Sequence, residues 1–364
     1  MSRPRTGTLF LRKDGSWCAQ ITLDDGRRKS FSGRDKTDVR TRMEEALRLQ
    51  REGRLVIGST MKLGDYLSWW LDIVAIGLAH NSYQSYRNAI QLPPELARIP
   101  MRTVKAHDIQ KWVSRQKSAP TTVRKKLAVV KQALDYAVTI GYIGFNPAEK
   151  IVKPRGGNRE MRTLTAHQAA VLVSATKGQP DHALWVTLLA TGMRVSEAMA
   201  LYWSDIDFDA GTIRVSHTLE KRDGSWYREP PKGKKQIRVI PVTSRELATL
   251  RAWKAQQAEL RLAATKWANP RLVFTLTGDP RDRHSAAKAL RRDLRAAGLP
   301  AVTPHDLRHT AGTLMDAAGE SARTIAERLG HADVSLTMRT YVHATDEAQH
   351  RAAQKLSDAI WEAS

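Results

Sequence analysis

The chain of 364 residues is too long for one small core and predicts two or three domains, and its 41% hydrophobic and 26% charged residues are ordinary for folded globular proteins. Its 59 Lys and Arg against 37 Asp and Glu give a net charge of +22, which favours a polyanionic partner, with nucleic acid first and an anionic membrane surface second. A single cysteine, Cys18, excludes an intrachain disulfide and a thiolate cluster for a metal.

The sequence of residues 1–55 predicts a small basic module. Its 14 basic and 8 acidic residues give a net charge of +6. Asp14-Gly15 and Asp25-Gly26 separate three short β-like runs, and Asp-Gly between such runs indicates a hairpin turn. A helix over Lys36–Arg51 has apolar residues near helical spacing and can cover one face of the resulting three-stranded sheet. The three runs are Thr8–Arg12, Trp17–Leu23 and Arg27–Ser32.

The sequence of residues 56–158 predicts a helical bundle with the largest surplus of charge of the three domains, 15 basic minus 6 acidic residues or +9. The clearest helix covers about Thr122–Ile140, where apolar residues form a buried stripe and Gly141 supplies a stop. Four cations lie largely off that stripe and form either a solvated face or a set of phosphate contacts, of which the overall charge favours the second. These candidate DNA-binding residues are Arg124, Lys125, Lys126 and Lys131.

A Lys-, Pro- and Gly-rich linker at Lys150–Arg159 resists regular structure, so the next domain is expected to cover residues 159–364. Thr165 and Gln168 have the spacing of a capping box, which predicts a helix start there. The rest of the domain predicts a mixed α+β unit, mainly helical, with a small antiparallel sheet. Its expected strands are Gly211–His217, Gln236–Val242 and Arg271–Leu276.

Five short pieces of this last domain carry residues suited to phosphoryl transfer: Thr191 to Glu197 with Arg194 inside, the turn around Lys232, His305 to His309 with Arg308 inside, Leu329-Gly330-His331, and Tyr341. Guanidinium groups can meet the two non-bridging oxygens of a phosphodiester in bidentate fashion, and a phenol can attack phosphorus once a base or cationic field helps it ionise. Each piece has an ordinary alternative. Arg194 could be a helix-surface residue, Tyr341 a half-buried aromatic, and His305 with His309 a metal pair, although no acidic ligand completes such a site.

Taken together and in this order, the pieces resemble the catalytic set of the tyrosine recombinase family, specifically phage integrases. The resemblance implies a phosphate clamp by Arg194 and Arg308, proton handling by His305 and a hydrogen bond from His331 to the scissile phosphate. It implies Tyr341 as nucleophile and Lys232 as general acid, with Lys234 and Lys235 as competitors for the lysine role. Glu197 matches an acidic residue that orients its neighbours or, equally, is a plain surface charge. No metal or other cofactor is implied.

The resemblance also assigns roles to the remaining modules. Residues 1–55 are similar to an arm-type DNA-binding domain, and 56–158 to a core-binding domain that closes over DNA, although Leu92–Leu96 is unlike the longer connection expected there. A tail helix over Asp346–Trp361 would pack on a neighbouring subunit or on its own core. The implied partners are double-stranded attachment-site DNA and three further copies of the chain in a homotetramer, with a host DNA-bending protein and an excisionase as further candidates.

Three rival interpretations remain open. A DNA-binding regulator with a recombinase fold would have lost a catalytic residue, and a type IB topoisomerase or telomere resolvase would not need an arm-type module. A membrane-surface protein would need an amphipathic anchor, and the most apolar stretch, Trp69–Ala79, is short and contains Asp72. Residues 1–12 lack the apolar core of a secretory signal, so the expected location is the cytoplasm of a bacterial host.

Overall fold

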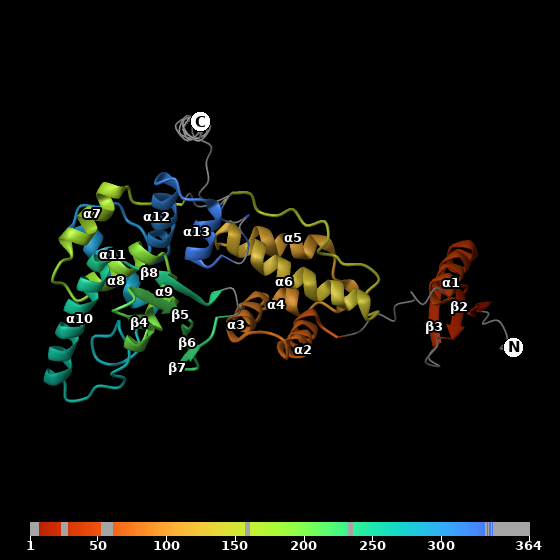
Figure 1. Cartoon of the computed structure of the whole chain (residues 1–364). Coiled ribbons are helices and arrows are strands. Elements are labelled where there is room, and N and C mark those ends of the chain that lie inside the picture. Colours follow the sequence, from red (N-terminus) through yellow and green to blue (C-terminus); the bar gives the residue numbers. More distant parts are fainter. Residues whose placement is uncertain are drawn as a thin grey trace, which may run out of the picture. The chain divides into compact units, whose positions relative to one another are not determined.

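The computed structural model describes residues 7–22, 28–51, 61–156, 161–231 and 236–331, together with 333, 335 and 337, the side chains of 49–51 excepted. The chain divides into two compact units, Met1–Arg159 and Glu160–Ser364. Small antiparallel sheets accompany a mainly helical structure, so the expected fold class is confirmed. Figure 1 shows the elements along the chain.

The N-terminal module is a three-stranded antiparallel sheet with one helix, as predicted. Strands β1 (Thr8–Leu11), β2 (Trp17–Thr22) and β3 (Arg28–Gly33) pair in sequence order, and α1 (Lys36–Arg51) packs on β2 and β3 (Figure 1). Their shared core includes Ala19, Ile21, Val39 and Met43. The Asp14-Gly15 turn is present, with Gly15 at φ 80°, while the Asp25-Gly26 turn lies outside the described residues.

The helical module is built around one apolar cluster. The hydroxyl of buried Tyr66 in α2 donates a hydrogen bond of 2.6 Å to the carbonyl of Ala133 in α6, which ties the first helix of the module to the last. The helix predicted at Thr122–Ile140 begins two residues earlier, because Pro120 occupies a first-turn position that needs no backbone donor. The helices are α2 (Leu63–Ala75), α3 (His80–Ala89), α4 (Pro94–Ala97), η1 (Met101–Thr103), α5 (Ala106–Ser114) and α6 (Pro120–Thr139).

The described part of the predicted linker, residues 150–156, has no helix or strand but is attached to the helical module. Gln110 exchanges hydrogen bonds with the backbone of Val152, at 2.9 and 3.4 Å. Arg124 donates from Nη1 to the carbonyl of Pro154 at 3.2 Å. These bonds satisfy backbone groups that a strand or helix would otherwise pair.

The second unit surrounds its own core with helices and two small sheets. The capping box predicted at Thr165 is present: Gln168 N donates to the Thr165 hydroxyl at 3.2 Å, and Gln168 Oε1 accepts from Thr165 N at 3.0 Å. The helices are α7 (Ala166–Ala175), α8 (His182–Thr191), α9 (Val195–Met199), η2 (Trp203–Asp205), α10 (Ser244–Ala263), α11 (Arg283–Ala296), α12 (Pro304–Ala317) and α13 (Ala322–Leu329).

Two of the three strands predicted for this unit form, shortened to β5 (Thr212–Val215) and β8 (Arg238–Pro241), which pair with each other. The third, Arg271–Leu276, was wrong. Leu272, Val273 and Phe274 are buried, but the segment forms an isolated bridge from Leu272 to Tyr202 rather than a strand. Three of its carbonyls accept hydrogen bonds from the side chains of Trp253 and Gln257 in α10. An apolar run indicates burial without indicating which groups take up its hydrogen bonds.

Sequence reasoning missed two features between α9 and α10. Strand β4 (Ile206–Asp207) completes a sheet of order β4-β5-β8, and β6 (Thr218–Arg222) and β7 (Ser225–Glu229) form a hairpin. The hairpin has the Asp-Gly signal, with Asp223 at φ 47° and Gly224 at φ 86°. No helix among the described residues is long and apolar enough to cross a membrane.

Candidate active site

Two left-handed glycines at helix ends form the framework of the site. Gly192 ends α8 at φ 63°, and Gly330 ends α13 at φ 71°, a conformation that glycine adopts without a Cβ penalty. A Cβ on Gly192 would lie 2.3 Å from Leu329 Cδ2, so the absent side chain lets the two helix ends approach closely. In Figure 1, α8, α12, α13 and β8 lie together in this unit.

Arg308 joins these two helix ends from inside α12. Its side chain is 1% exposed, and Nη1 donates to the carbonyl of Gly192 at 2.8 Å and to that of Leu329 at 2.5 Å. Both acceptors belong to the last turn of a helix, where carbonyls lack intrahelical partners and a positive charge is favoured. A buried guanidinium is therefore held at the point where α8, α12 and α13 meet.

Arg194 begins α9 two residues after Gly192. Its Nη1 donates to Oε1 of Glu197 at 2.8 Å, and its backbone N–H donates to Oε2 of the same carboxylate at 2.8 Å. Its Nη2 lies 3.5 Å from the carbonyl of Gly330. Because the side chain of Arg194 is 32% exposed, it presents positive charge toward solvent while its inner face is fixed.

Glu197 is a buried ion-pair partner, 1% exposed, and so it is not the plain surface charge that sequence left open. Besides Arg194, it accepts from Arg238 in β8, at 2.9 Å to Oε2 and 3.3 Å to Oε1. Burial alone would raise its pKa, but the hydrogen bonds and charges of Arg238 and Arg194 outweigh burial and lower it. The carboxylate therefore stays ionised between two guanidinium groups.

Arg238 and Arg328 are site residues that sequence reasoning missed. Arg238 Nε donates to the carbonyl of Arg328 at 2.8 Å, and Arg328 Nη2 donates to the carbonyls of Ala190 in α8 and Pro241 in β8, at 2.8 and 3.1 Å. These bonds fasten the end of α13 to both neighbours. The available signal, a basic residue within a predicted strand, is too common to single out Arg238.

His331 follows Gly330 directly and is placed by the helix cap. Its backbone N–H donates to the carbonyl of Ala326 at 2.9 Å, and Nδ1 lies 2.7 Å from the hydroxyl of the fully buried Thr337. Burial, then the positive charges of Arg308 and Arg194, lower the pKa of His331 to about 4. The imidazole is therefore neutral at physiological pH, and Thr337 is a further contact that the motif search missed.

His305 and His309 share one side of α12, with ring centroids 4.6 Å apart in an edge-on contact. His305 is exposed near the helix start, whereas His309 is half-buried and has a pKa lowered to about 4 by burial and by His305. Among the described residues no group of three or more His, Cys, Asp or Glu side chains could hold a metal ion.

Two catalytic candidates and one predicted element lie outside the described residues. They are Lys232, with its competitors Lys234 and Lys235, then Tyr341, and the tail helix expected over Asp346–Trp361. Of the six catalytic candidates, Arg194, Arg308 and His331 lie around the two glycine caps. His305 is on the same helix as Arg308, three residues before it.

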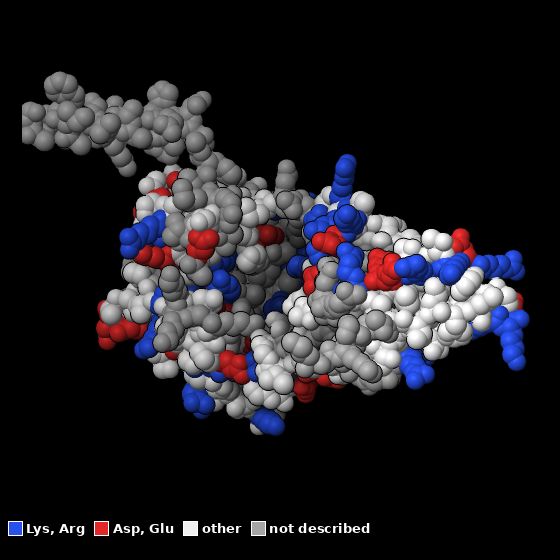
Figure 2. Space-filling view, turned by 90° about the vertical axis from the view of Figure 1, so that its right-hand side faces the viewer, with Lys and Arg blue, Asp and Glu red and all other residues white. Residues whose placement is uncertain are grey.

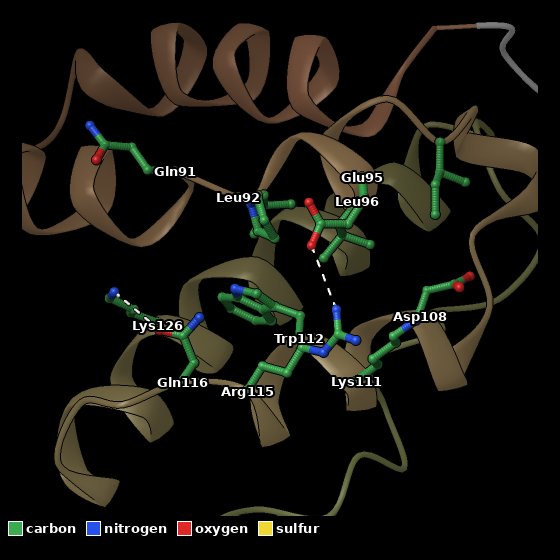
Figure 3. Close-up of a pocket in the computed structure, with 12 residues that line it drawn as sticks. Gln91, Leu92, Glu95, Leu96, Asp108, Lys111, Trp112, Arg115, Gln116 and Lys126 are labelled. Carbon is green, nitrogen blue, oxygen red and sulfur yellow. Dashed lines mark hydrogen bonds and ion pairs between the residues drawn. The ribbon is translucent and has the colours of Figure 1, made fainter.

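The four DNA-binding candidates on α6 have different surroundings. Lys125 is exposed, whereas Arg124 and Lys131 are partly buried and Arg124 holds the linker. Lys126 contacts Gln116 at 3.5 Å and lines a cavity of about 510 Å³ beside Trp112, with the Arg115–Glu95 ion pair across it (Figure 3). On the face drawn in Figure 2, groups of Lys and Arg project from the surface with Asp and Glu between them.

Comparison with known proteins finds a family whose model matches the part of the chain that contains this site. The model of the phage integrase family matches residues 162–348, just over half of the chain. A XerC-like tyrosine recombinase from Caldanaerobacter subterraneus subsp. tengcongensis is 28% identical over 95% of this chain and 97% of its own length. An integrase from Streptomyces ambofaciens is 28% identical over 93% of this chain and 92% of its own.

Solved structures share the fold. The Tn1549 transposon integrase in complex with transposon right end DNA superposes with a TM-score of 0.70 at 22% identity, covering 82% of this chain and all of that one. A lambda integrase dimer bound to a core site gives a TM-score of 0.59 at 16% identity, over 94% of this chain and 96% of that one.

Proposed function

This chain belongs to the phage integrase family of tyrosine recombinases, enzymes that cleave and rejoin DNA, and from that premise we propose that it is a site-specific recombinase of a phage or mobile element that integrates DNA and also excises it. The observation that carries the proposal is the convergence of Arg194, Arg308 and His331 around the caps at Gly192 and Gly330. These residues come from three separate segments, with Arg194 more than a hundred positions before the other two, and they meet where a phosphate would find cations in fixed positions.

The cations of the site suit the charge that develops during strand cleavage. A phosphodiester under attack gains negative charge on its non-bridging oxygens, and donors held in place beforehand stabilise that charge without having to reorganise. We assign this clamp to Arg194 and Arg308. The neutral imidazole of His331 would add a hydrogen bond to the same phosphate.

Tyr341 is the proposed nucleophile, and its oxygen would form the new bond to phosphorus while the bond to the 5′ oxygen breaks. Lys232, or else Lys234 or Lys235, would give a proton to that departing oxygen, and His305 would handle the proton of the phenol. The products are a 3′-phosphotyrosine and a free 5′ hydroxyl. Because the phosphoester is retained, a second 5′ hydroxyl can attack it and rejoin the strand without ATP.

The proposed oligomeric state follows from the type of reaction. Exchange between two duplexes, each cut at two positions, needs four active sites, and a lambda integrase tetramer bound to a Holliday junction superposes on this chain with a TM-score of 0.58. We therefore propose a homotetramer on attachment-site DNA, acting in the cytoplasm of a bacterial host. A host DNA-bending protein and an excisionase are its proposed accessory partners.

Covalent capture tests the proposal. Full-length protein is incubated in excess EDTA with sheared DNA that flanks its own gene, the reaction is stopped with detergent, and fragments that remain attached to protein are sequenced. We expect the wild type to retain one site and Tyr341→Phe to retain none while binding that site with similar affinity. A regulator would shift the same fragments without retaining any. An adduct that needs added magnesium would contradict the metal-free mechanism.

A further inference from the structure

We propose that Arg238 is a positioning residue for strand cleavage, which holds Glu197 and the end of α13 in one arrangement and thereby fixes Arg194 relative to His331. The inference rests on the proposed function for what the arrangement serves, and on the contacts of Arg238 for the arrangement itself. Arg238 comes from β8, so it is a third element fastening two that carry catalytic candidates.

Arg238 uses every edge of its guanidinium on the site framework. Nη2 and Nη1 donate to the two oxygens of Glu197, Nε donates to the carbonyl of Arg328, and Nη1 also donates to the carbonyl of Gln236 at 3.0 Å. The side chain is 8% exposed, so solvent does not compete for these donors. A planar fork can satisfy the carboxylate on one edge and the helix carbonyl on another, whereas a lysine ammonium cannot reach both in the same geometry.

The charges explain why Glu197 needs a second arginine. Paired with Arg194 alone, the buried carboxylate would neutralise the cation that is proposed to bind phosphate. With Arg238 also on Glu197, the three groups together keep one positive charge, and the exposed edge of Arg194 remains attractive to an anion. The second arginine thus lets Glu197 orient Arg194 without cancelling its charge.

The chain leaves room for this guanidinium at Gly330. A Cβ on Gly330 would lie 2.7 Å from Arg238 Nη1 and 3.0 Å from Cζ, so the bare glycine is what allows the side chain to lie against the end of α13. His331, the next residue, therefore follows a helix end against which Arg238 packs. Loss of Arg238 would remove one of the contacts that hold the end of α13 and one of the two cations on Glu197, the carboxylate that orients Arg194.

A second carboxylate in the same unit offers a matched control. Asp181 is 3% exposed and is also held by two arginines, Arg281 at 2.5 Å and Arg292 at 3.5 Å. It lies at the start of α8, the opposite end of that helix from Gly192. Arg281→Gln therefore removes one of two arginines from a buried carboxylate, as Arg238→Gln does, without touching the site.

The test compares full-length wild type, Arg238→Gln, Arg238→Lys and Arg281→Gln by hydrogen–deuterium exchange without DNA and by single-turnover cleavage of a nicked duplex carrying the captured site. We expect Arg238→Gln to raise exchange in residues 190–200 and 322–331 and to slow cleavage by about 100-fold at saturating DNA, with little change in DNA affinity. Arg238→Lys should recover part of the rate, and Arg281→Gln should keep it.

Hydrogen–deuterium exchange tests the positioning role of Arg238, and cleavage by the wild type tests the proposed function, so either can fail without the other. Failure of the wild type to cleave would refute the recombinase function, while exchange would still report whether Arg238 positions α9 and α13. Unchanged exchange in both segments of Arg238→Gln would overturn the inference. So would equal slowing of cleavage by Arg281→Gln, because any lost buried ion pair would then have the same effect.

Discussion

At the scale of residues, the site combines buried cations with neutral histidines. Arg308 and Arg194 surround His331, and a protonated imidazole there would face two guanidinium groups in a poorly hydrated position. Burial is the main cause of the lowered pKa of His331 and the two cations add to it, whereas the pKa of His309 is lowered by burial and by His305. Burial and the cations that would bind phosphate therefore together keep the imidazole of His331 uncharged.

This arrangement predicts a pH dependence of stability. His309 has a pKa of about 4 in the folded chain and an ordinary value of 6.5 when unfolded, so the unfolded chain binds more protons between these values. The contribution of neutral His309 to the free energy of unfolding is fully present above pH 6.5 and is lost as the pH falls from 6.5 toward 4. We expect the unfolding midpoint to fall over this window, and His309→Gln to reduce the slope by about one proton. A slope unchanged by His309→Gln in thermal unfolding across pH 4–7 would refute the assigned shift.

The site residues that could be predicted from the sequence are those that belong to recognisable motifs. The motifs around Arg194, Arg308 and His331 selected three residues that lie around the same two helix ends. Arg238 could not be selected, because its partner Glu197 lies 41 positions away in α9 and only the fold brings the two side chains together. A lone basic residue in a strand carries no signal of that kind.

Among the helices, strands and turns, short sequence patterns correctly predicted the features that depend on neighbouring residues. The capping box at Thr165, the Asp14-Gly15 turn and the helix Lys36–Arg51 were predicted from short patterns and are present. The strand predicted at 271–276 was wrong because three of its carbonyls accept hydrogen bonds from side chains of α10, about twenty positions away in sequence, and its backbone pairing amounts to an isolated bridge at Leu272. Sequence patterns indicate which residues are buried more reliably than they indicate which partners the backbone groups bind by hydrogen bonds.

The close approach of two helix ends at Gly192 gives a prediction at this scale. Gly192 and Gly298 both follow helices of the second unit with positive φ, but a Cβ on Gly298 would meet nothing within 4 Å, while one on Gly192 would strike Leu329. Gly298→Ala should cost about 1 kcal/mol of unfolding free energy from left-handed strain alone. Gly192→Ala should cost at least about 2 kcal/mol more, because the tightly packed helix end must shift.

Chemical denaturation of the two variants measures the difference. The second unit should unfold at clearly lower denaturant concentration in Gly192→Ala than in Gly298→Ala, and cleavage should fall only in the former. Equal destabilisation by the two substitutions would mean that α8 and α13 do not depend on the bare glycine for their approach.

At the scale of the whole molecule, a net charge of +22 predicts DNA binding that weakens steeply with salt. Each phosphate neutralised releases counterions, so affinity should fall by about 10³-fold or more between 50 and 200 mM salt if six or more phosphates are contacted. Lys125→Gln, at an exposed position of α6, should reduce the slope of log affinity against log salt by about 1.

The matched control for Lys125 is Lys177, which is also exposed but lies in the loop before α8, at the end of that helix far from Gly192. Fluorescence anisotropy over a salt series compares the two variants. An unchanged slope in Lys125→Gln, or an equal loss in Lys177→Gln, would show that the exposed lysine of α6 does not contact phosphate.

Tyr341 is proposed to carry the DNA during strand exchange, and mapping the covalent adduct shows which side chain does so. The captured complex is digested with nuclease and protease, and the modified peptide is sequenced by mass spectrometry. We expect a single nucleotide joined through its 3′ phosphate to the oxygen of Tyr341. A nucleotide on any other side chain, or one joined through its 5′ phosphate, would refute the proposed role of Tyr341.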